Sequence, residues 1–434
     1  MKYRPDIDGM RALAVLAVLF FHADLGCSGG YVGVDVFFVV SGYLIGRIVA
    51  DEVDSGKFSY RNFWERRLRR LLPALAAVLL FSTVAGWFLL FPQDYQELGA
   101  TLVAQPLLAS NFVFWQTVQS GYFADAPEIR PTLHTWSLAV EEQFYLLYPA
   151  LMLLAHRVGG PKRAFQALLL VALISLGLSL ALTSGHANFA YFLLPTRAFE
   201  ILLGALAWKV PIPKPGWLRE GLAWLGLACI LVAILGYRED SVFPGYLALL
   251  PCLGTVLLLV TGRLQPTAVS RGFSHPLWVW FGLQSYSLYL WHWPIIAYWK
   301  YTVMPWQLEH RLGLVALSVF VAQVSLRGIE RPFRQRRWLG STSGIFGAAA
   351  VFSVLCYVVG YAIWFSEGVP DRWSRLSQSL VTVEEGRFYG GVSNQELEQG
   401  RLINFGVQDQ NAPTVFVWGD SHAMALLDGL DPLC

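Results

Sequence analysis

The sequence is dominated by long apolar runs, and these runs restrict the kinds of fold that it can adopt. Twelve of them occur along the 434 residues. An apolar run of about 20 residues is long enough to cross the hydrocarbon core of a bilayer as a helix, so we expect an all-α polytopic membrane protein. The runs lie near residues 10–25, 34–50, 72–92, 97–115, 137–155, 165–183, 189–209, 221–237, 244–262, 278–299, 313–329 and 343–365.

The composition excludes an ordinary soluble protein. Hydrophobic residues make up 55% of the chain and charged residues 14%, whereas a soluble domain carries about 25% charged residues. The mean hydropathy of +0.47 agrees with this. With 32 basic and 30 acidic residues the formal net charge is +2. We therefore predict the lipid bilayer as a partner and no binding to nucleic acid.

The loop charges predict which runs cross the membrane, because Lys and Arg concentrate in cytoplasmic loops. If the run at 97–115 does not cross, the basic loops all fall on one side. Gln105–Pro106 in the middle of that run makes a broken or re-entrant segment plausible. We therefore predict about 11 transmembrane helices, with the N-terminus cytoplasmic and the C-terminus outside. The outer side then keeps Arg130, Arg197, Arg238, Lys300 and Arg311.

The chain changes character after Phe365, where a polar stretch begins. Residues 414–418 predict a buried strand, and residues from Ala423 onward predict a helix. Between them lies a tight turn in which Asp420 precedes Ser421. A strand, a turn that carries a serine and a helix form the local architecture of many nucleophile turns. We expect the start of an α/β domain here, incomplete at the last residue of the sequence.

Arg11 and His22 lie eleven residues apart in the first apolar run. At about 100° per residue they share one face of a helix, and roughly 16.5 Å separates them along its axis. Arg11 could simply reach the headgroups, and His22 could be an interfacial histidine. An ionisable residue inside a membrane is nevertheless a functional candidate by default, because burying it is costly.

Further polar residues lie in and before the next two runs. Asp35 and Ser41 stand in an apolar, glycine-rich segment. Packing between helices explains the glycines of that segment but not the aspartate. The next run is preceded by an arginine cluster, which is either a topology anchor or a clamp for phosphate, since Arg grips phosphate oxygens in bidentate fashion. The cluster consists of Arg66, Arg67, Arg69 and Arg70.

Two later segments combine histidine with aromatic or acidic residues. His134 and Trp136 stand shortly before Glu141 and Glu142 at the start of a span. His134 and Glu141 fall on one side of a helix. Acidic residues are also common at solvated helix starts, but histidine and tryptophan beside them favour a functional site. His292 lies among tyrosines and tryptophans, which favour the membrane interface in any case.

Together these motifs resemble those of the membrane-bound acyltransferase-3 family, from about residue 4 to residue 332. The resemblance covers some three quarters of the chain, and its motifs are specific in combination. They are Arg11 with His22; residues 33–44, Gly-Val-Asp-Val-Phe-Phe-Val-Val-Ser-Gly-Tyr-Leu; residues 66–73, Arg-Arg-Leu-Arg-Arg-Leu-Leu-Pro; residues 134–145, His-Thr-Trp-Ser-Leu-Ala-Val-Glu-Glu-Gln-Phe-Tyr; and residues 286–294, Tyr-Ser-Leu-Tyr-Leu-Trp-His-Trp-Pro.

The polar tail resembles the periplasmic SGNH-hydrolase-like domain that is fused to one branch of this family. Residues 419–422, Gly-Asp-Ser-His, correspond to its nucleophile block, and its later blocks are absent from the sequence. The resemblance implies three parts: residues 1–335 as the acyltransferase-3 transmembrane domain, residues 336–366 as an additional helix and linker, and residues 367–434 as a periplasmic linker and incomplete SGNH-like domain.

The resemblance implies transfer of an acyl group, most often acetyl, from cytoplasmic acyl-CoA to a hydroxyl of an envelope glycan. The glycan is O-antigen, exopolysaccharide or peptidoglycan, the membrane is the bacterial inner membrane, acetyl-CoA is the co-substrate and no metal is expected. The expected donor contacts are Arg66, Arg67, Arg70, Trp136 and His292. The expected catalytic residues are His22 as general base or transient acyl acceptor, Asp8 or Arg11 beside it, His134, Glu141 and Glu142 along the path, and Ser421 with Asp420 as the outer acceptor.

A transporter of polysaccharide or lipid-linked sugar is the alternative from another class of protein. Its arginines would hold pyrophosphate, and its buried His and Asp residues would relay protons. It would need a path wide enough for a sugar and no catalytic serine outside. A purely structural subunit would leave the buried ionisable residues unexplained.

Overall fold

The computed structural model describes residues 3–118, 130–302 and 306–372. Within these ranges the chain is helical, with no β-strand. Seven helices among the described residues are long and apolar enough to cross a membrane. The prediction of an all-α polytopic fold is therefore confirmed for this part of the chain, while the predicted number of 11 crossings stays a prediction. The seven are Gly30–Asp54, Tyr60–Leu89, Thr135–Leu182, Ala187–Ala207, Gly216–Gly236, Leu308–Arg334 and Thr342–Phe365.

The helices of the described residues differ widely in length. In chain order they are α1 Pro5–His22, α2 Gly33–Asp54, α3 Tyr60–Leu89, α4 Pro92–Ala104, α5 Ser110–Thr117, α6 Thr135–Leu182, α7 Ala187–Phe192, α8 Leu194–Ala207, α9 Gly216–Gly236, α10 Leu249–Thr261, α11 Ala268–Phe273, α12 Pro276–Leu283, α13 Ser285–Thr302, α14 Leu308–Ser325, α15 Arg331–Arg334 and α16 Thr342–Phe365. Single 3-10 turns are η1 Gly30–Val32, η2 Gln105–Leu107 and η5 Pro370–Arg372, and one π-turn, η4 Leu326–Glu330, joins α14 to α15.

The apolar runs correspond to helices with two informative differences. The run at 97–115 is broken as expected, because α4 ends at Ala104 and η2 begins at Gln105, one residue before Pro106. The run at 278–299 was expected to be one span, and this is wrong. It forms α12 and α13, which separate at Gln284; both pack against α1, and α13 also packs against α14 and α3.

Large apolar side chains cover the outer faces of several helices. In α16, Val351, Val354 and Leu355 are all more than half exposed. In α9, Val232 and Leu235 are also more than half exposed. A soluble protein rarely exposes contiguous apolar surface on this scale, whereas lipid tails solvate it. The chain is therefore a multi-pass membrane protein.

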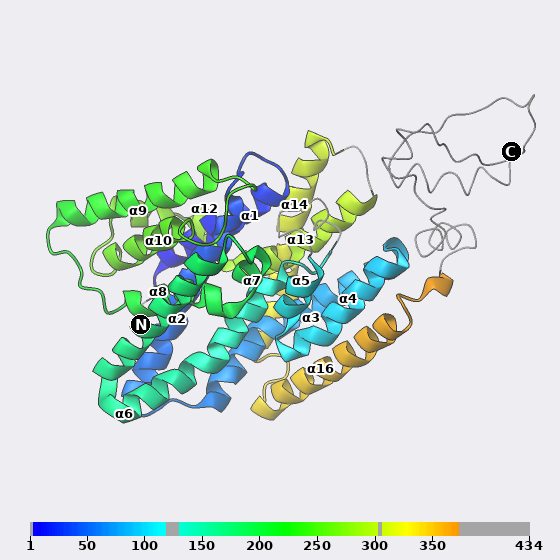
Figure 1. Cartoon of the computed structure of the whole chain (residues 1–434), viewed down its shortest axis with the longest axis horizontal. Coiled ribbons are helices and arrows are strands. Elements are labelled where there is room, and N and C mark those ends of the chain that lie inside the picture. The colour runs from blue at the N-terminus through cyan, green and yellow to red at the C-terminus, as the bar shows by residue number, and fades with distance from the viewer. Residues whose placement is uncertain (1–2, 119–129, 303–305, 373–434) are drawn as a thin grey trace, which may run out of the picture.

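The helices form a bundle whose edges and centre are clear in Figure 1. The last helix, α16, lies along α4 and α3 at one edge, and α9 pairs with α10 at another. Between these edges α8 packs closely against α2 and α6, and α1 packs against α12, α2 and α13. Residues from α1, α2, α3, α6 and α13 therefore meet inside the bundle.

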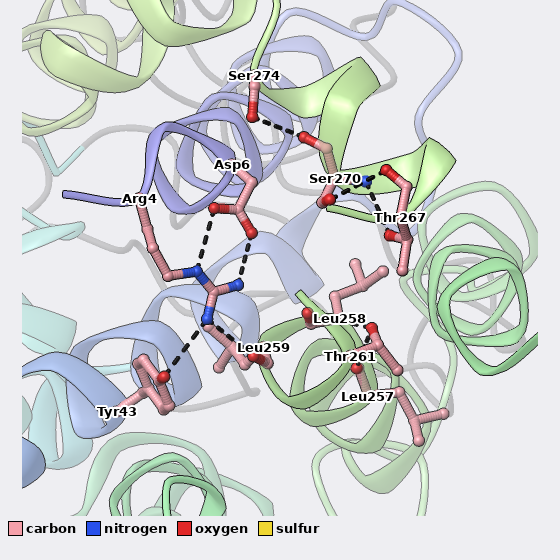
Figure 2. Close-up of polar contacts among 10 residues, drawn as sticks. All are labelled: Arg4, Asp6, Tyr43, Leu257, Leu258, Leu259, Thr261, Thr267, Ser270 and Ser274. Carbon is pink, nitrogen blue, oxygen red and sulfur yellow. Dashed lines mark hydrogen bonds and ion pairs between the residues drawn. The ribbon is translucent and has the colours of Figure 1, made fainter. Parts of the chain in front are cut away.

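The start of the chain is fastened to the bundle by Arg4 (Figure 2). Its guanidinium binds Asp6 and donates to the carbonyl of Leu259 in α10 at 2.9 Å. It also contacts the hydroxyl of Tyr43 in α2 at 3.4 Å. These contacts fix where α1 begins, and hence the depth at which Arg11 and His22 lie.

Two glycines allow α2 and α8 to approach closely. A Cβ at Gly42 would overlap the backbone of Ile201, and a Cβ at Gly204 would overlap the backbone of Val39. Small residues at facing positions let helix backbones touch in membranes. The expectation that glycines in this segment serve close packing is confirmed at Gly42.

The close approach of α2 and α8 creates a buried charge cluster that accounts for Asp35. Arg197 lies 3.4 Å from Asp35 and 2.9 Å from Glu200, and all three are at most 1% exposed. The topology prediction counted Arg197 among the loop charges of the outer side; it is not a loop residue, and its side of the membrane stays a prediction. Arg197 lies inside α8, where its charge is neutralised by neighbours rather than by solvent. Its guanidinium is surrounded at 5.4–5.6 Å by the rings of Phe38, Trp136, Tyr191 and Phe243.

The same cluster contains the donor types of a metal site. Asp35, Glu200 and Cys252 each bring one ligand-type atom within 4.8 Å of the others. Arg197 already supplies a cation to both carboxylates. We therefore interpret the cluster as an ion-paired element of the fold.

The ratio of two carboxylates to one guanidinium predicts an asymmetric response to mutation. Arg197→Met leaves two buried carboxylates without a cation and should cost about 3–5 kcal/mol of stability. Asp35→Asn and Glu200→Gln each leave a matched pair and should cost clearly less. Thermal unfolding of the detergent-purified protein measures the difference, with Arg238→Met, which changes an exposed arginine, as the control. Equal losses in all three cluster variants would contradict the ion-pair interpretation.

Candidate active site

A cavity of about 730 Å³, counted with its open mouth, lies inside the bundle. Five helices line it, namely α1, α2, α3, α6 and α13. Its wall carries three guanidiniums, one carboxylate and several hydroxyls, while the remainder is apolar. The polar lining residues are Arg11, Ser41, Arg67, Arg70, Ser137, Glu141, Ser285, Tyr286 and Tyr289.

One of the three arginines is held by the protein itself. Arg67 donates from Nε and from a terminal nitrogen to the two carboxylate oxygens of Glu142, so that both forks are engaged. Its Cζ also lies 3.6 Å from the ring centre of Tyr145. Both partners come from α6, so this contact joins α3 to α6 at the cavity wall. Arg67 is therefore already neutralised.

Arg70 is one helical turn further along α3 and has a different environment. Within the described residues it makes no hydrogen bond and no ion pair, although it lines the cavity. Arg11 lines the cavity as well and lies 3.5 Å from Asp8. A guanidinium that faces a cavity without a partner is suited to bind an anionic ligand.

Arg66 belongs to the same sequence cluster but points elsewhere. It is about half exposed and forms an ion pair with Glu52 at 2.9 Å, outside the cavity. Arg69 is also outside it, because it binds Glu65 and the backbone at residues 339–341. Of the four arginines in the cluster, the structure brings Arg67 and Arg70 to the cavity.

Tyr289 of α13 lines the same cavity as the arginines of α1 and α3. Its hydroxyl is 2.7 Å from Oγ of Ser137 and donates to the carbonyl of His134 at 3.0 Å. Its ring centre lies 5.6 Å from that of His134 and 5.6 Å from that of His292. Tyr289 thus has cavity on one side and histidines on the other.

His22 lies in this histidine cluster rather than in hydrocarbon. It is 7% exposed, and its Nδ1 is 3.0 Å from Nε2 of His292, which is fully buried. The two rings are nearly parallel at 16° with centres 5.2 Å apart, so they meet edge to edge, and Trp293 packs edge-on against His22 at 4.4 Å. His134 joins from α6, with its ring centre 6.1 Å from that of His292.

The register of α13 relates the cavity to the histidines. Ser285, Tyr286 and Tyr289 line the cavity. His292 follows Tyr289 by three residues and therefore lies on the same face, about 4.5 Å further along the axis. The histidine pair accordingly lies about one helical turn beyond the last cavity-lining residue of this helix.

The expected positioning of His22 by Asp8 or Arg11 is not what the structure shows. Asp8 and Arg11 pair with each other near the start of α1, and at 1.5 Å per residue Arg11 is roughly 16 Å from His22 along the helix. Among the contacts of His22 is the one to His292, which was expected to contact the donor. Nor does Trp136 line the cavity, because it covers Arg197.

Two further expectations have separate outcomes. Glu141 lines the cavity, in agreement with its proposed place on the path, whereas Glu142 acts through its pair with Arg67. Ser421 and Asp420 lie outside the described residues.

Sequence reasoning missed the roles of Tyr289 and Glu200. Tyr289 was present in a quoted motif, but nothing local marks which tyrosine of an aromatic segment faces a cavity. Glu200 could have been found, because Arg197 and Glu200 stand three residues apart inside an apolar run. That spacing places opposite charges on one helix face, which is a sign of an intramembrane ion pair.

Comparison of the sequence with models of protein families gives a match over most of the chain. The model described as "Acyltransferase domain", that of the acyltransferase-3 family, matches residues 4–327. The chain belongs to the acyltransferase-3 family. The match includes α1 to α14, and hence every residue that lines the cavity. The family resemblance inferred from the motifs is confirmed for the membrane part. No solved structure matches the chain.

Similar proteins with curated names are O-acetyltransferases. The chain is 32% identical over 356 residues to the O-acetyltransferase OatA of Staphylococcus aureus, a match that covers 77% of this chain and 58% of that protein. It is 32% identical over 418 residues to the peptidoglycan O-acetyltransferase OatA of Listeria monocytogenes, covering 91% of this chain and 63% of that protein. The chain thus spans about three fifths of the length of these relatives.

The different states of Arg67 and Arg70 predict different effects on stability. Arg67→Met leaves Glu142 without its partner in a mostly buried position and should cost about 3 kcal/mol or more. Arg70→Met removes a guanidinium that has no partner and should leave the melting temperature unchanged or higher. Thermal unfolding in detergent compares the two, and a larger loss for Arg70→Met would refute the assignment.

Proposed function

We propose that the protein transfers an acyl group, most plausibly acetyl, from cytoplasmic acyl-CoA to a hydroxyl of an envelope glycan. Membership of an acyltransferase family supports the reaction class. The observation that carries the proposal is the cavity, which has Arg70 and Arg11 on its wall and ends at Tyr289, beside the His22–His292 pair. Such a cavity suits a ligand with phosphates at one end and a reactive thioester at the other.

The arginines give the donor its orientation. Acyl-CoA carries several phosphates, and in the predicted topology the start of α3 faces the cytoplasm, where acyl-CoA is made. Arg70 and Arg11 would hold phosphate oxygens. Arg67, fixed by Glu142, would add positive charge without leaving its partner. The acyl end would then extend toward Ser137 and Tyr289.

His22 supplies the proton chemistry in this proposal. As general base it would take the proton of an acceptor hydroxyl while that oxygen forms a bond to the thioester carbon. The carbon–sulfur bond would break, and the CoA thiolate would leave and take up a proton. Alternatively His22 would hold the acyl group briefly on a ring nitrogen. His134 and Glu141 shape the two sides of the path.

The acceptor is an envelope glycan on the outer side of a bacterial cytoplasmic membrane. Peptidoglycan is the first candidate, because one relative is named a peptidoglycan O-acetyltransferase. Residues 367–434 would form the start of an SGNH-like domain on that side, in which Ser421, with Asp420 beside it, would receive the acyl group and pass it to the sugar.

The first test concerns His22. His22→Ala should lower acetyl transfer from labelled acetyl-CoA to peptidoglycan in membranes by about 10²–10⁴-fold, the usual contribution of a general base. His186→Ala changes an exposed histidine outside the site and should have no effect. Wild-type transfer by His22→Ala would eliminate the mechanism. Translocation of a lipid-linked sugar without release of CoA would favour the transporter alternative.

The second test concerns the donor. Arg70→Ala should raise the Kd for acetyl-CoA about tenfold, since a hydrogen bond to a charged group contributes about 1.5–3 kcal/mol. Arg66→Ala removes a neighbouring arginine that lies outside the cavity and should leave the Kd unchanged. Titration calorimetry in nanodiscs measures both. Acetyl-pantetheine, which lacks the phosphates, should bind more weakly and be insensitive to Arg70→Ala, and equal effects of the two substitutions would refute the phosphate site.

A further inference from the structure

The contact between His22 and His292 determines where the ring protons lie. Nδ1 of His292 is 3.1 Å from the carbonyl oxygen of Leu288, one turn earlier in α13. A carbonyl oxygen can only accept a hydrogen bond, so this contact requires a proton on Nδ1 of His292. The fixed backbone of the helix therefore selects one tautomer of His292.

That tautomer decides the tautomer of His22. Both rings are buried inside the bundle, where a charged imidazole is costly and a neutral one is favoured. A neutral His292 protonated at Nδ1 has its lone pair on Nε2, the atom that lies 3.0 Å from Nδ1 of His22. His22 must then donate from Nδ1, and its own lone pair lies on Nε2.

We propose that His292 is a positioning residue that holds His22 as the Nδ1-protonated tautomer and thereby makes Nε2 of His22 its basic and nucleophilic atom. This inference rests on the proposed function, in which His22 accepts a proton or an acyl group. The tautomer of a reactive histidine is usually fixed by a hydrogen bond from its other ring nitrogen to a carboxylate or a backbone carbonyl. Here an imidazole lies between the reactive ring and the carbonyl of Leu288.

The arrangement has a chemical consequence at the end of the cavity. A neutral acceptor orients His22 without adding a negative charge to a site that already lies inside a membrane. The hydrogen bond between the two nearly coplanar rings and the packing of Trp293 restrict rotation of the His22 ring. The ring is therefore held in one tautomer and one orientation before the donor arrives.

The tautomer can be observed without any activity measurement. In protein labelled with ¹⁵N-histidine and placed in liposomes, magic-angle-spinning NMR should show His22 protonated at Nδ1 and unprotonated at Nε2, with its signals assigned by their loss in His22→Ala. In His292→Phe, which keeps a ring but removes the acceptor, His22 should shift to the Nε2-protonated form that imidazole favours in water. An Nε2-protonated His22 in the unaltered protein would overturn the proposal.

Measurements of kcat and KM provide the second test of the proposal. His292→Phe should lower kcat for acetyl transfer about 100-fold, with the KM for acetyl-CoA unchanged, because His292 does not line the cavity. His292→Gln, whose amide oxygen can accept near the position of Nε2, should recover most of kcat. A purely structural role would instead lower activity and melting temperature together in both variants. If His22→Ala retained transfer, the proposed function would fail, whereas the NMR result would still decide the tautomer.

Discussion

Buried charges that must be neutralised within the protein decide how the central helices are arranged. Inside a bilayer water cannot solvate an isolated charge, so each guanidinium needs a carboxylate or an aromatic shell nearby. Arg197 of α8 takes Asp35 of α2, and Arg67 of α3 takes Glu142 of α6. These two pairs connect four helices, three of which line the cavity. The cavity therefore exists where the ion pairs hold its walls.

The same principle separates supporting arginines from ligand-binding ones. Arg67 and Arg197 have carboxylate partners, and removing those partners would leave a buried charge. Arg70 forms no ion pair among the described residues, and Arg11, Arg67 and Arg334 act on it as like charges, while the carboxylates of Glu141 and Glu330 interact with it from a greater distance than an ion pair. Holding an unpaired guanidinium beside others costs free energy in the empty protein. An anionic ligand would recover that cost, which is why unpaired charge in a cavity is a sign of binding rather than of folding.

Local patterns in the sequence predicted the fold class and several residues of the cavity. The apolar runs, the break at Gln105–Pro106 and the candidate status of Arg11 and Glu141 follow from composition or from helical spacing, whereas the expectation for Arg70 came from the family resemblance. The partner of Asp35 does not, because Arg197 stands 162 residues away and only packing brings them together. The contact of His22 with His292 has the same origin. Local spacing places residues on a face of one helix, but it does not say which other helix that face will meet.

The division between cavity and histidines bears on how a group could cross the membrane. Along α1 the guanidinium of Arg11 and the imidazole of His22 are roughly 16 Å apart, so a single small ligand cannot contact both. A donor that is long, with phosphates near Arg11 and Arg70, could place its far end against Ser137 and Tyr289. Between those residues and His22 lie the rings of Tyr289 and His292, whose centres are 5.6 Å apart. The side chain of Tyr289 is held there by hydrogen bonds to Ser137 and to the carbonyl of His134. The histidine pair thus lies about one helical turn beyond the cavity-lining part of α13, a distance far shorter than the thickness of the bilayer.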